Sequence, residues 1–120
     1  MKKYDIIVIG AGSAGLNVSV FMNSIGLKVL LIDRSSENIG GDCLNYGCVP
    51  SQALIHAARI ANNAMESEKF GFKFSGKVNL KEVIEYVKNR QEIIRKHENP
   101  KHFRKLGIDV VLGKARFKEK

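Results

Sequence analysis

The feature that most constrains the fold of this chain is a glycine-rich turn between an apolar segment and a helical one. Residues 4–9 are apolar and rich in β-branched side chains, which predicts a buried parallel strand. Residues 10–15 read Gly-Ala-Gly-Ser-Ala-Gly, and residues 14–25 then carry apolar side chains at helical spacing. A second apolar run follows at residues 28–33. Strand, turn, helix and strand within about 30 residues predict a βαβ unit with a right-handed crossover.

Each glycine of this turn has a predicted role. Gly10 allows a tight turn out of the strand, Gly12 lets the backbone approach a pyrophosphate, and Gly15 lets the helix pack close to the sheet. The helix N-terminus then offers free N–H groups and a partial positive charge to the phosphates. Asp33 ends the second strand, where a carboxylate accepts ribose hydroxyls and repels a 2′-phosphate. The pattern predicts a dinucleotide site without separating FAD from NAD, and the alternative is a turn that only packs.

The rest of the chain continues in an α/β pattern. Residues 34–47 are rich in Ser, Asn and Gly and are expected to form a loop. Helices are expected over residues 49–64 and 80–98, followed by a short one after Asn99-Pro100. The expected fold is a partial Rossmann-like α/β domain, with parallel strands at about residues 4–9, 28–33 and 108–112 and a helical insertion at about 50–106.

The chain has two cysteines, Cys43 and Cys48, with four residues between them. Such a segment can bend enough to bring the two Cα atoms within disulfide range. Cys48 lies where a helix begins, just before Pro50, so the helix dipole is expected to lower the pKa of its thiol. Cys43, in the loop, is the better placed thiol to meet an external partner. The alternatives are half of a metal site, for which only scattered histidines are present, or two inert buried thiols.

Composition narrows the possible partners. The formal net charge is +8, but Lys and Arg alternate with Glu along the helical segments, and aromatic residues do not alternate with them. The pattern favours a solvated surface over nucleic-acid binding. Apolar runs are too short for a membrane span, and the N-terminus lacks the features of a signal peptide. A cytoplasmic protein is expected, in which a close cysteine pair is redox-active or metal-binding rather than structural.

Residues 40–52, Gly-Gly-Asp-Cys-Leu-Asn-Tyr-Gly-Cys-Val-Pro-Ser-Gln, resemble the redox-active disulfide signature of the class I pyridine nucleotide-disulfide oxidoreductases. That family includes dihydrolipoamide dehydrogenase, glutathione reductase and mercuric reductase. The resemblance covers the whole chain, and residues 97–110 look most like the mercuric-reductase type. It implies that the dinucleotide is FAD. It also implies electron flow from NAD(P)H through FAD to a Cys43–Cys48 disulfide, and on to a small-molecule disulfide, a protein disulfide or a metal ion.

The resemblance also implies roles for single residues. Cys48 lies against the isoalloxazine as the thiolate that interacts with the flavin, and Cys43 is the thiol that exchanges with substrate. Lys114 and Ala115 offer backbone groups to the adenine. The cofactor contacts implied in this way are Gly10, Gly12, Ser13, Ala14, Gly15, Asp33, Arg34, Gly41, Asp42, Cys43, Cys48, Gln52, Lys114 and Ala115.

Three residues depart from the family pattern. Gln52 replaces the usual Lys near the flavin, Asp42 replaces Thr, and Asp33 replaces the longer Glu. Loss of the Lys cation is expected to change the flavin potential.

The chain is also several times shorter than family members. Residues 1–120 are therefore expected to be the N-terminal part of an FAD-binding domain, inactive alone, from an enzyme that forms homodimers. The NAD(P)H and dimerisation domains are expected to lie outside these residues. The alternatives are a stand-alone nucleotide-binding or thiol redox-sensing module, and a structural remnant that binds nothing.

Overall fold

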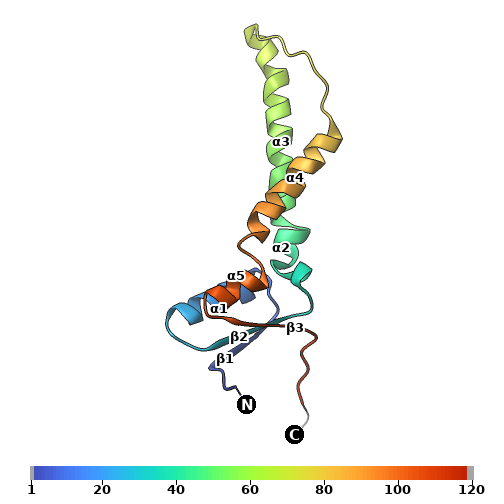
Figure 1. Cartoon of the computed structure of the whole chain (residues 1–120). Helices are drawn as coiled ribbons and strands as arrows, with labels where there is room; N and C mark the ends of the chain where they lie inside the picture. The colour runs from blue at the N-terminus through green and yellow to red at the C-terminus, as the bar shows by residue number, and fades with distance from the viewer. Residues whose placement is uncertain (1, 119–120) are drawn as a thin grey trace.

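A three-stranded parallel sheet forms the base of the molecule (Figure 1). The computed structural model describes residues 2–118. The strands are β1 (Ile6–Ile9), β2 (Val29–Asp33) and β3 (Asp109–Leu112), and β2 lies between the other two. Ile6 pairs with Val29 across β1 and β2, and Leu30 pairs with Asp109 across β2 and β3. The three predicted strands and their parallel arrangement are confirmed, with ends shifted by two residues or fewer.

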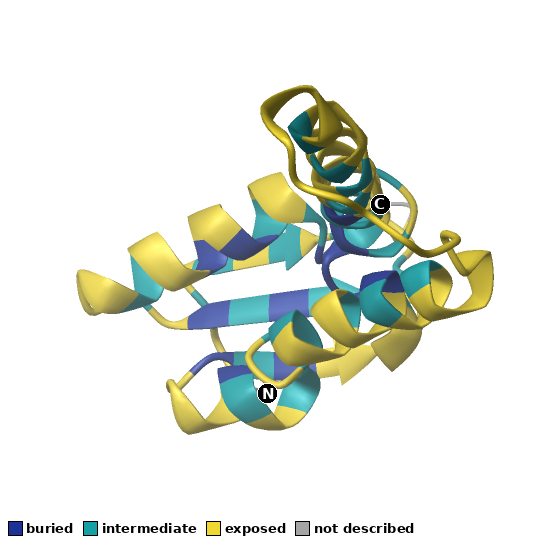
Figure 2. Cartoon of the chain, turned by 90° about the horizontal axis from the view of Figure 1, so that it is seen from above, coloured by how far each residue is buried: buried dark blue, intermediate teal, exposed yellow. Residues whose placement is uncertain are grey.

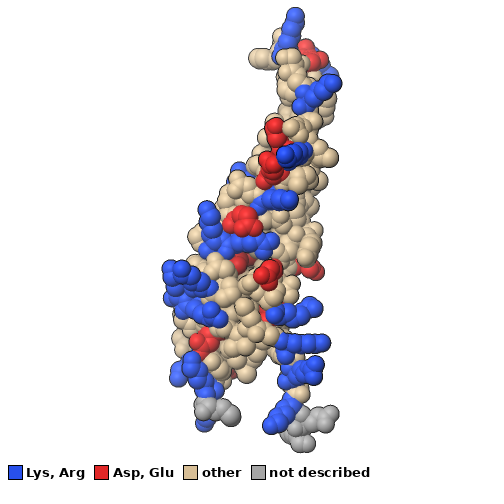
Figure 3. All heavy atoms as spheres, turned by 45° about the vertical axis from the view of Figure 1, so that its right-hand side comes forward, with Lys and Arg blue, Asp and Glu red and all other residues tan. Residues whose placement is uncertain are grey.

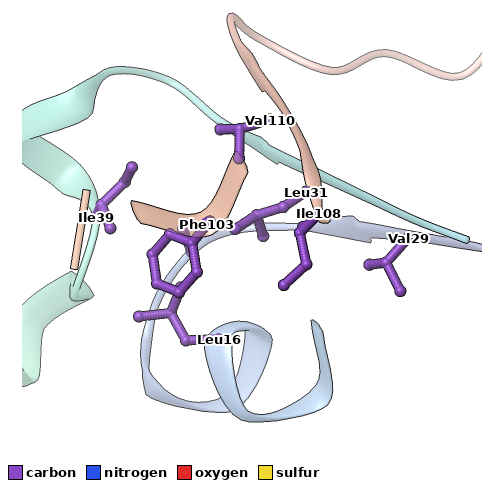
Figure 4. Close-up of a cluster of buried hydrophobic side chains, with 8 residues drawn as sticks. Leu16, Val29, Leu31, Ile39, Phe103, Ile108 and Val110 are labelled. Carbon is purple, nitrogen blue, oxygen red and sulfur yellow. The ribbon is translucent and has the colours of Figure 1, made fainter. Parts of the chain in front are cut away.

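Two helices cover one face of this sheet. They are α1 (Ser13–Ser24), which follows the glycine turn, and α5 (Pro100–Lys105), which precedes β3 (Figure 1). The Asn23 side-chain amide of α1 donates to the Leu106 carbonyl oxygen just after α5, over 2.8 Å. The apolar core lies between these helices and the sheet (Figure 4), and its buried members are Ala11, Leu16, Val29, Leu31, Ile39, Phe103, Ile108 and Val110.

The helical insertion is shorter than predicted. The helices α3 (Cys48–Glu66) and α4 (Leu80–Arg95) form a hairpin that projects away from the sheet (Figure 1). A short 3-10 helix, η2 (Ser67–Phe70), follows α3 at its far end. Helices continue to Lys105, as predicted, but α5 returns to the sheet and buries Phe103 in the core.

The hairpin is mostly exposed (Figure 2), and its projection makes the molecule elongated, at 71 × 28 × 21 Å. Its buried residues are few, and Ala53 and Val87 are the ones that lie on α3 and α4. Asn79 caps α4 by accepting from the Lys81 backbone N–H over 3.1 Å. Most of the hairpin is therefore supported by contacts between its own two helices.

The segment 34–47 is not the open loop that its composition predicted. It contains a 3-10 helix, η1 (Ser36–Asn38), and a short helix, α2 (Gly41–Asn45). Buried Ile39 and Leu44 hold this segment against the rest of the protein. Gly40, with φ +92°, redirects the chain between the two helices. Burial of two large apolar side chains therefore outweighs the turn-forming composition of the segment.

Candidate active site

The glycine turn packs as its spacing predicted. Gly10 has φ +101°, and its N–H donates to the Ile32 carbonyl oxygen of β2 over 2.8 Å. A Cβ on Gly15 would collide with the Gly10 carbonyl oxygen, so α1 needs glycine there to approach the strand. The predicted packing roles of Gly10 and Gly15 are thus visible in the backbone itself.

Gly12 meets the cysteine segment. A Cβ added to Gly41 would lie 2.7 Å from the Gly12 Cα atom, closer than real Cβ contacts allow. The Gly40 N–H donates to the Ala11 carbonyl oxygen over 2.8 Å, which fixes this crossing. The turn and the segment that carries the cysteines therefore form one continuous surface.

Asp33 holds the glycine turn from the end of β2. One carboxylate oxygen, Oδ2, accepts from the Ala11 N–H, and the other, Oδ1, accepts from the Arg34 N–H, both over 2.6 Å. Each carboxylate oxygen has a second lone pair, so the side chain can still accept from a ribose hydroxyl. A short Asp can thus both hold the turn and face a nucleotide.

A hollow of about 350 Å³ lies at the carboxyl ends of the strands. This is the edge of a parallel α/β sheet at which such folds bind ligands. Seven of the predicted cofactor residues line it: Gly10, Asp33, Arg34, Gly41, Asp42, Lys114 and Ala115. Sequence reasoning missed Asn38, Asn45, Tyr46 and Gly113, which line it too. We call this hollow the cradle.

The missed residues follow from the folding of segment 34–47. Asn45 and Tyr46 reach the cradle because α2 turns back towards the sheet, which the composition of the segment does not reveal. Gly113 is held in place by its own N–H, which donates to the Asp33 carbonyl oxygen over 2.7 Å. The Gly-Lys-Ala sequence after β3 was the only signal for this part.

The two thiols are free and lie on consecutive helices. Cys43 is half-buried within α2, and exposed Cys48 is the first residue of α3. The backbone between them turns tightly, because the Tyr46 and Gly47 N–H groups both donate to the Asp42 carbonyl oxygen, over 2.8 and 2.6 Å. This turn brings the thiols within hydrogen-bonding reach of each other.

The pKa values of the thiols differ in the direction opposite to the prediction. Hydrogen bonds from Cys48 first, and from Ser13 second, lower the pKa of the Cys43 thiol. The hydrogen bond to Cys43 and the charge on its thiolate raise the pKa of Cys48. The expectation that the pKa of Cys48 is lowered is wrong for the reduced pair, because it considered the helix dipole and left out the neighbouring thiol.

Each thiol faces a different hollow. Cys43 and Ser13 line one of about 440 Å³, which we call the Cys43 hollow. Cys48 and Gln52 line another of about 510 Å³ between α3 and α4, together with Arg90. Val49 lines both, so the pair lies on the boundary between them. Ala14 is exposed and lines neither of these hollows nor the cradle.

Gln91 connects the hairpin to the cysteine segment. Its side-chain amide nitrogen, Nε2, donates to the Leu44 and Asn45 carbonyl oxygens over 2.9 and 3.0 Å. These carbonyl groups belong to α2, next to Cys43. Sequence reasoning gave Gln91 no role, since the helical pattern of residues 80–98 does not reveal the hydrogen-bond partner of an amide side chain.

Two further features are absent from the described residues. Within residues 2–118, no three His, Cys, Asp or Glu side chains are grouped as a metal site requires. None of the helices that the structure describes is long and apolar enough to cross a bilayer.

The fold and the site define a nucleotide-binding α/β unit with a dithiol packed against its glycine turn. Comparison with known proteins agrees. The family described as "Pyridine nucleotide-disulphide oxidoreductase" matches residues 4–115, and the chain belongs to that family. This is an enzyme family that uses FAD and NAD(P)H. The resemblance deduced from residues 40–52 is confirmed.

Individual relatives show how much of such an enzyme the chain represents. It is 41% identical over 83 residues to a dihydrolipoyl dehydrogenase of Thermus scotoductus, covering 69% of this chain and 18% of that protein. It is 32% identical over 114 residues to one of Acholeplasma laidlawii, covering 93% of this chain and 33% of that protein. The chain thus spans a third or less of the length of these relatives.

A solved structure gives the same result for the fold. The Cu(II) complex of the HOCl-induced flavoprotein disulfide reductase RclA from Escherichia coli superposes with a TM-score of 0.69 at 28% identity. The match covers 98% of this chain and 23% of that one. A partial Rossmann-like FAD-domain fold is therefore established for the chain.

Proposed function

We propose that residues 1–120 form the N-terminal part of the FAD-binding domain of a disulfide oxidoreductase. In that enzyme, electrons pass from NAD(P)H through FAD to the Cys43–Cys48 pair, and then to a disulfide or a metal ion. The NAD(P)H and dimerisation domains lie outside these residues, in an enzyme that we expect to be a homodimer. The observation that carries the proposal is the contact of Gly41 with Gly12, because it joins the glycine turn to the dithiol segment.

The cradle has features that suit FAD. Gly12 and Gly41 meet without a side chain between them, and a glycine backbone can approach a pyrophosphate closely. Asp33, Lys114 and Ala115 all line the cradle, which supports our proposal that Asp33 accepts from the adenosine ribose and that Lys114 and Ala115 offer backbone groups to the adenine. Arg34 and Lys114 supply positive charge, which offsets the carboxylates of Asp33 and Asp42. Bound FAD would supply two-electron transfer between a nicotinamide and the dithiol.

The protein's own groups carry the thiol chemistry. The lowered pKa of Cys43 favours its thiolate, which is the form that attacks a disulfide. Ser13 keeps this thiolate hydrogen-bonded from the start of α1. Cys48 lies close enough to displace a substrate thiol from Cys43 and to close the internal disulfide.

The first test is a redox titration of the chain in glutathione buffers, read by intact mass. The expected result is one two-electron transition to an internal Cys43–Cys48 disulfide. The Cys43→Ser and Cys48→Ser variants serve as controls and should form only mixed disulfides with glutathione. Independent oxidation of the two thiols in the wild type would reject the dithiol role.

The second test is titration with FAD followed by flavin fluorescence. Weak binding is expected, because one face of the sheet is uncovered in residues 2–118. Gly12→Val is expected to abolish it, because glycine at this position lets the backbone approach the pyrophosphate. Sub-micromolar affinity would contradict the view that the domain is incomplete. No FAD binding together with an oxidant-responsive dithiol would favour the alternative, a stand-alone thiol redox module.

A further inference from the structure

The Cys43 hollow differs in charge from the rest of the protein. The chain has 20 Lys and Arg residues, and Figure 3 shows them distributed along the whole molecule. None of the described residues that line the Cys43 hollow is Lys or Arg. The cradle, by contrast, includes Arg34 and Lys114. Among the described residues that line this hollow, Glu98 is the one with a carboxylate, and the others carry no carboxylate, ammonium or guanidinium group.

Glu98 lies close to the cysteine segment. A Cβ added to Gly40 would be 2.8 Å from the carboxylate oxygen Oε2 of Glu98, so this oxygen lies against the start of α2. Burial raises the pKa of Glu98, and Arg95 opposes that effect. The Arg95 guanidinium, however, is paired with Glu92, from its Nε to Oε1 over 3.0 Å. The charge of Glu98 is therefore only partly compensated.

The negative charge of Glu98 reaches the reactive thiol. Hydrogen bonds from Cys48 and Ser13 lower the pKa of the Cys43 thiol, burial raises it, and the charge of Glu98 raises it by a smaller amount. A charge that acts on the Cys43 sulfur also acts on any molecule that approaches this sulfur.

Most of the other residues that line the hollow are apolar or aromatic, and Ser13 and Asn17 are its neutral polar residues. Its inner wall includes Leu16 and Phe103 of the core, with Ile94 and Leu106 beside them. The rings of His97 and His102 lie edge to face with their centroids 5.5 Å apart, and His102 also packs against Phe103. The apolar surfaces suit the hydrocarbon or ring groups that flank a disulfide bond, and the hollow has no guanidinium or ammonium group to pair with a carboxylate.

We propose that the Cys43 hollow accepts organic disulfides with apolar, neutral or cationic substituents and rejects anionic ones, and that Glu98 determines this specificity. The proposal deepens the proposed function and rests on it. In the reaction, the Cys43 thiolate attacks R–S–S–R, forms a mixed disulfide and releases RS⁻. Cys48, as its thiolate, then attacks the Cys43 sulfur, which closes the internal disulfide and releases the second RS⁻. The dithiol loses two electrons, the substrate gains two, and the two protons pass to the released thiolates.

The test uses the reduced full chain and three dialkyl disulfides of similar size and different charge. They are cystamine, which is cationic, bis(2-hydroxyethyl) disulfide, which is neutral, and 3,3′-dithiodipropionate, which is anionic. The rate of Cys43–Cys48 disulfide formation is followed by mass at low ionic strength. The rate with the neutral probe reports the thiolate fraction, so the rate with each charged probe is divided by the rate with the neutral probe.

Glu98→Gln is expected to slow the cationic probe and speed the anionic probe, each by about threefold, so their ratio changes by about tenfold. Glu85→Gln is the matched control, because it removes the same charge from an exposed position on α4 that does not line the hollow. For Glu85→Gln, the ratio of the cationic-probe rate to the anionic-probe rate is expected to equal that of the wild type. Glu98→Lys should invert the preference, and circular dichroism should confirm that each variant is folded.

Two outcomes overturn the proposal. An unchanged ratio in both Glu98 variants rejects Glu98 as the specificity residue. Equal changes in Glu98→Gln and Glu85→Gln would mean that net charge, not the hollow, sets the preference. If no probe produces the internal disulfide, the dithiol function fails as well, so the failure of the proposed function is distinguishable from the failure of this inference.

Discussion

The sheet region and the α3–α4 hairpin are stabilised in different ways. In the sheet region, eight residues form a common core, with Leu31 and Ile39 fully buried. In the hairpin, large apolar side chains such as Ile60, Met65 and Phe70 are exposed. The site is built where the two regions meet, since Cys43 belongs to the segment packed on the sheet and Cys48 begins the hairpin. The cradle therefore depends on a firm core, while one thiol depends on a helix with little support beyond its partner helix.

The largest expected effect comes from the core. Leu31→Ala should destabilise the protein by about 3 kcal/mol, because Leu31 is fully buried on the central strand. Ile60→Ala on the hairpin is the control and should cost less than about 0.5 kcal/mol, because Ile60 is 58% exposed. Urea denaturation measures both. Equal losses would show that the hairpin and the sheet form one cooperative core.

The next largest loss of stability is expected where Gly41 lies against Gly12. Gly41→Ala should cost about 2 kcal/mol, because its Cβ would meet the Gly12 Cα at 2.7 Å and because Gly41 has φ +58°. Gly12→Ala is the matched control, since its Cβ would lie at an ordinary 3.8 Å from Gly41. Similar unfolding midpoints for the two variants would contradict the close approach.

Removing a helix cap should affect stability less than these changes do, and by different amounts in the sheet region and the hairpin. Asn99 caps α5 by accepting from the His102 N–H over 2.9 Å, and Asn99→Ala should lower the free energy of global unfolding by about 1 kcal/mol. Asn79 caps the outer end of α4, where fraying is local. Asn79→Ala should therefore accelerate hydrogen exchange in the first turn of α4 and change global stability less than Asn99→Ala does. A larger global loss for Asn79→Ala would refute the distinction.

The smallest effect is on thiol titration. Alkylation by iodoacetamide at increasing pH should modify Cys43 before Cys48, because the pKa of Cys43 is lowered and that of Cys48 is raised. Cys48→Ala should raise the pKa of Cys43, and Ser13→Ala should raise it less, since the Cys48 hydrogen bond is the larger cause. Peptide mass mapping gives the site and the rate. Prior modification of Cys48 would show that the helix dipole dominates after all.

The sequence predicted most of what depends on local pattern. The glycine spacing led to the βαβ unit, and Asn99-Pro100 marked the start of α5 correctly. The pairing of segment 34–47 with the glycine turn was not predictable, because it depends on the burial of Ile39 and Leu44 in a segment of loop-like composition. The direction of the Cys48 pKa shift was wrong for a related reason: it depends on a hydrogen bond with Cys43, and the spacing of the two residues does not determine the distance between their thiols.

The two hydrogen bonds from Gln91 connect the hairpin to α2. The outer part of the hairpin extends into solvent, and its inner end is hydrogen-bonded to the peptide groups beside Cys43. A rotation of α4 about its own axis would break the hydrogen bonds from the Gln91 amide to both carbonyl oxygens at once. The orientation of α4 is therefore linked, through a single amide group, to the backbone of the short helix that carries Cys43.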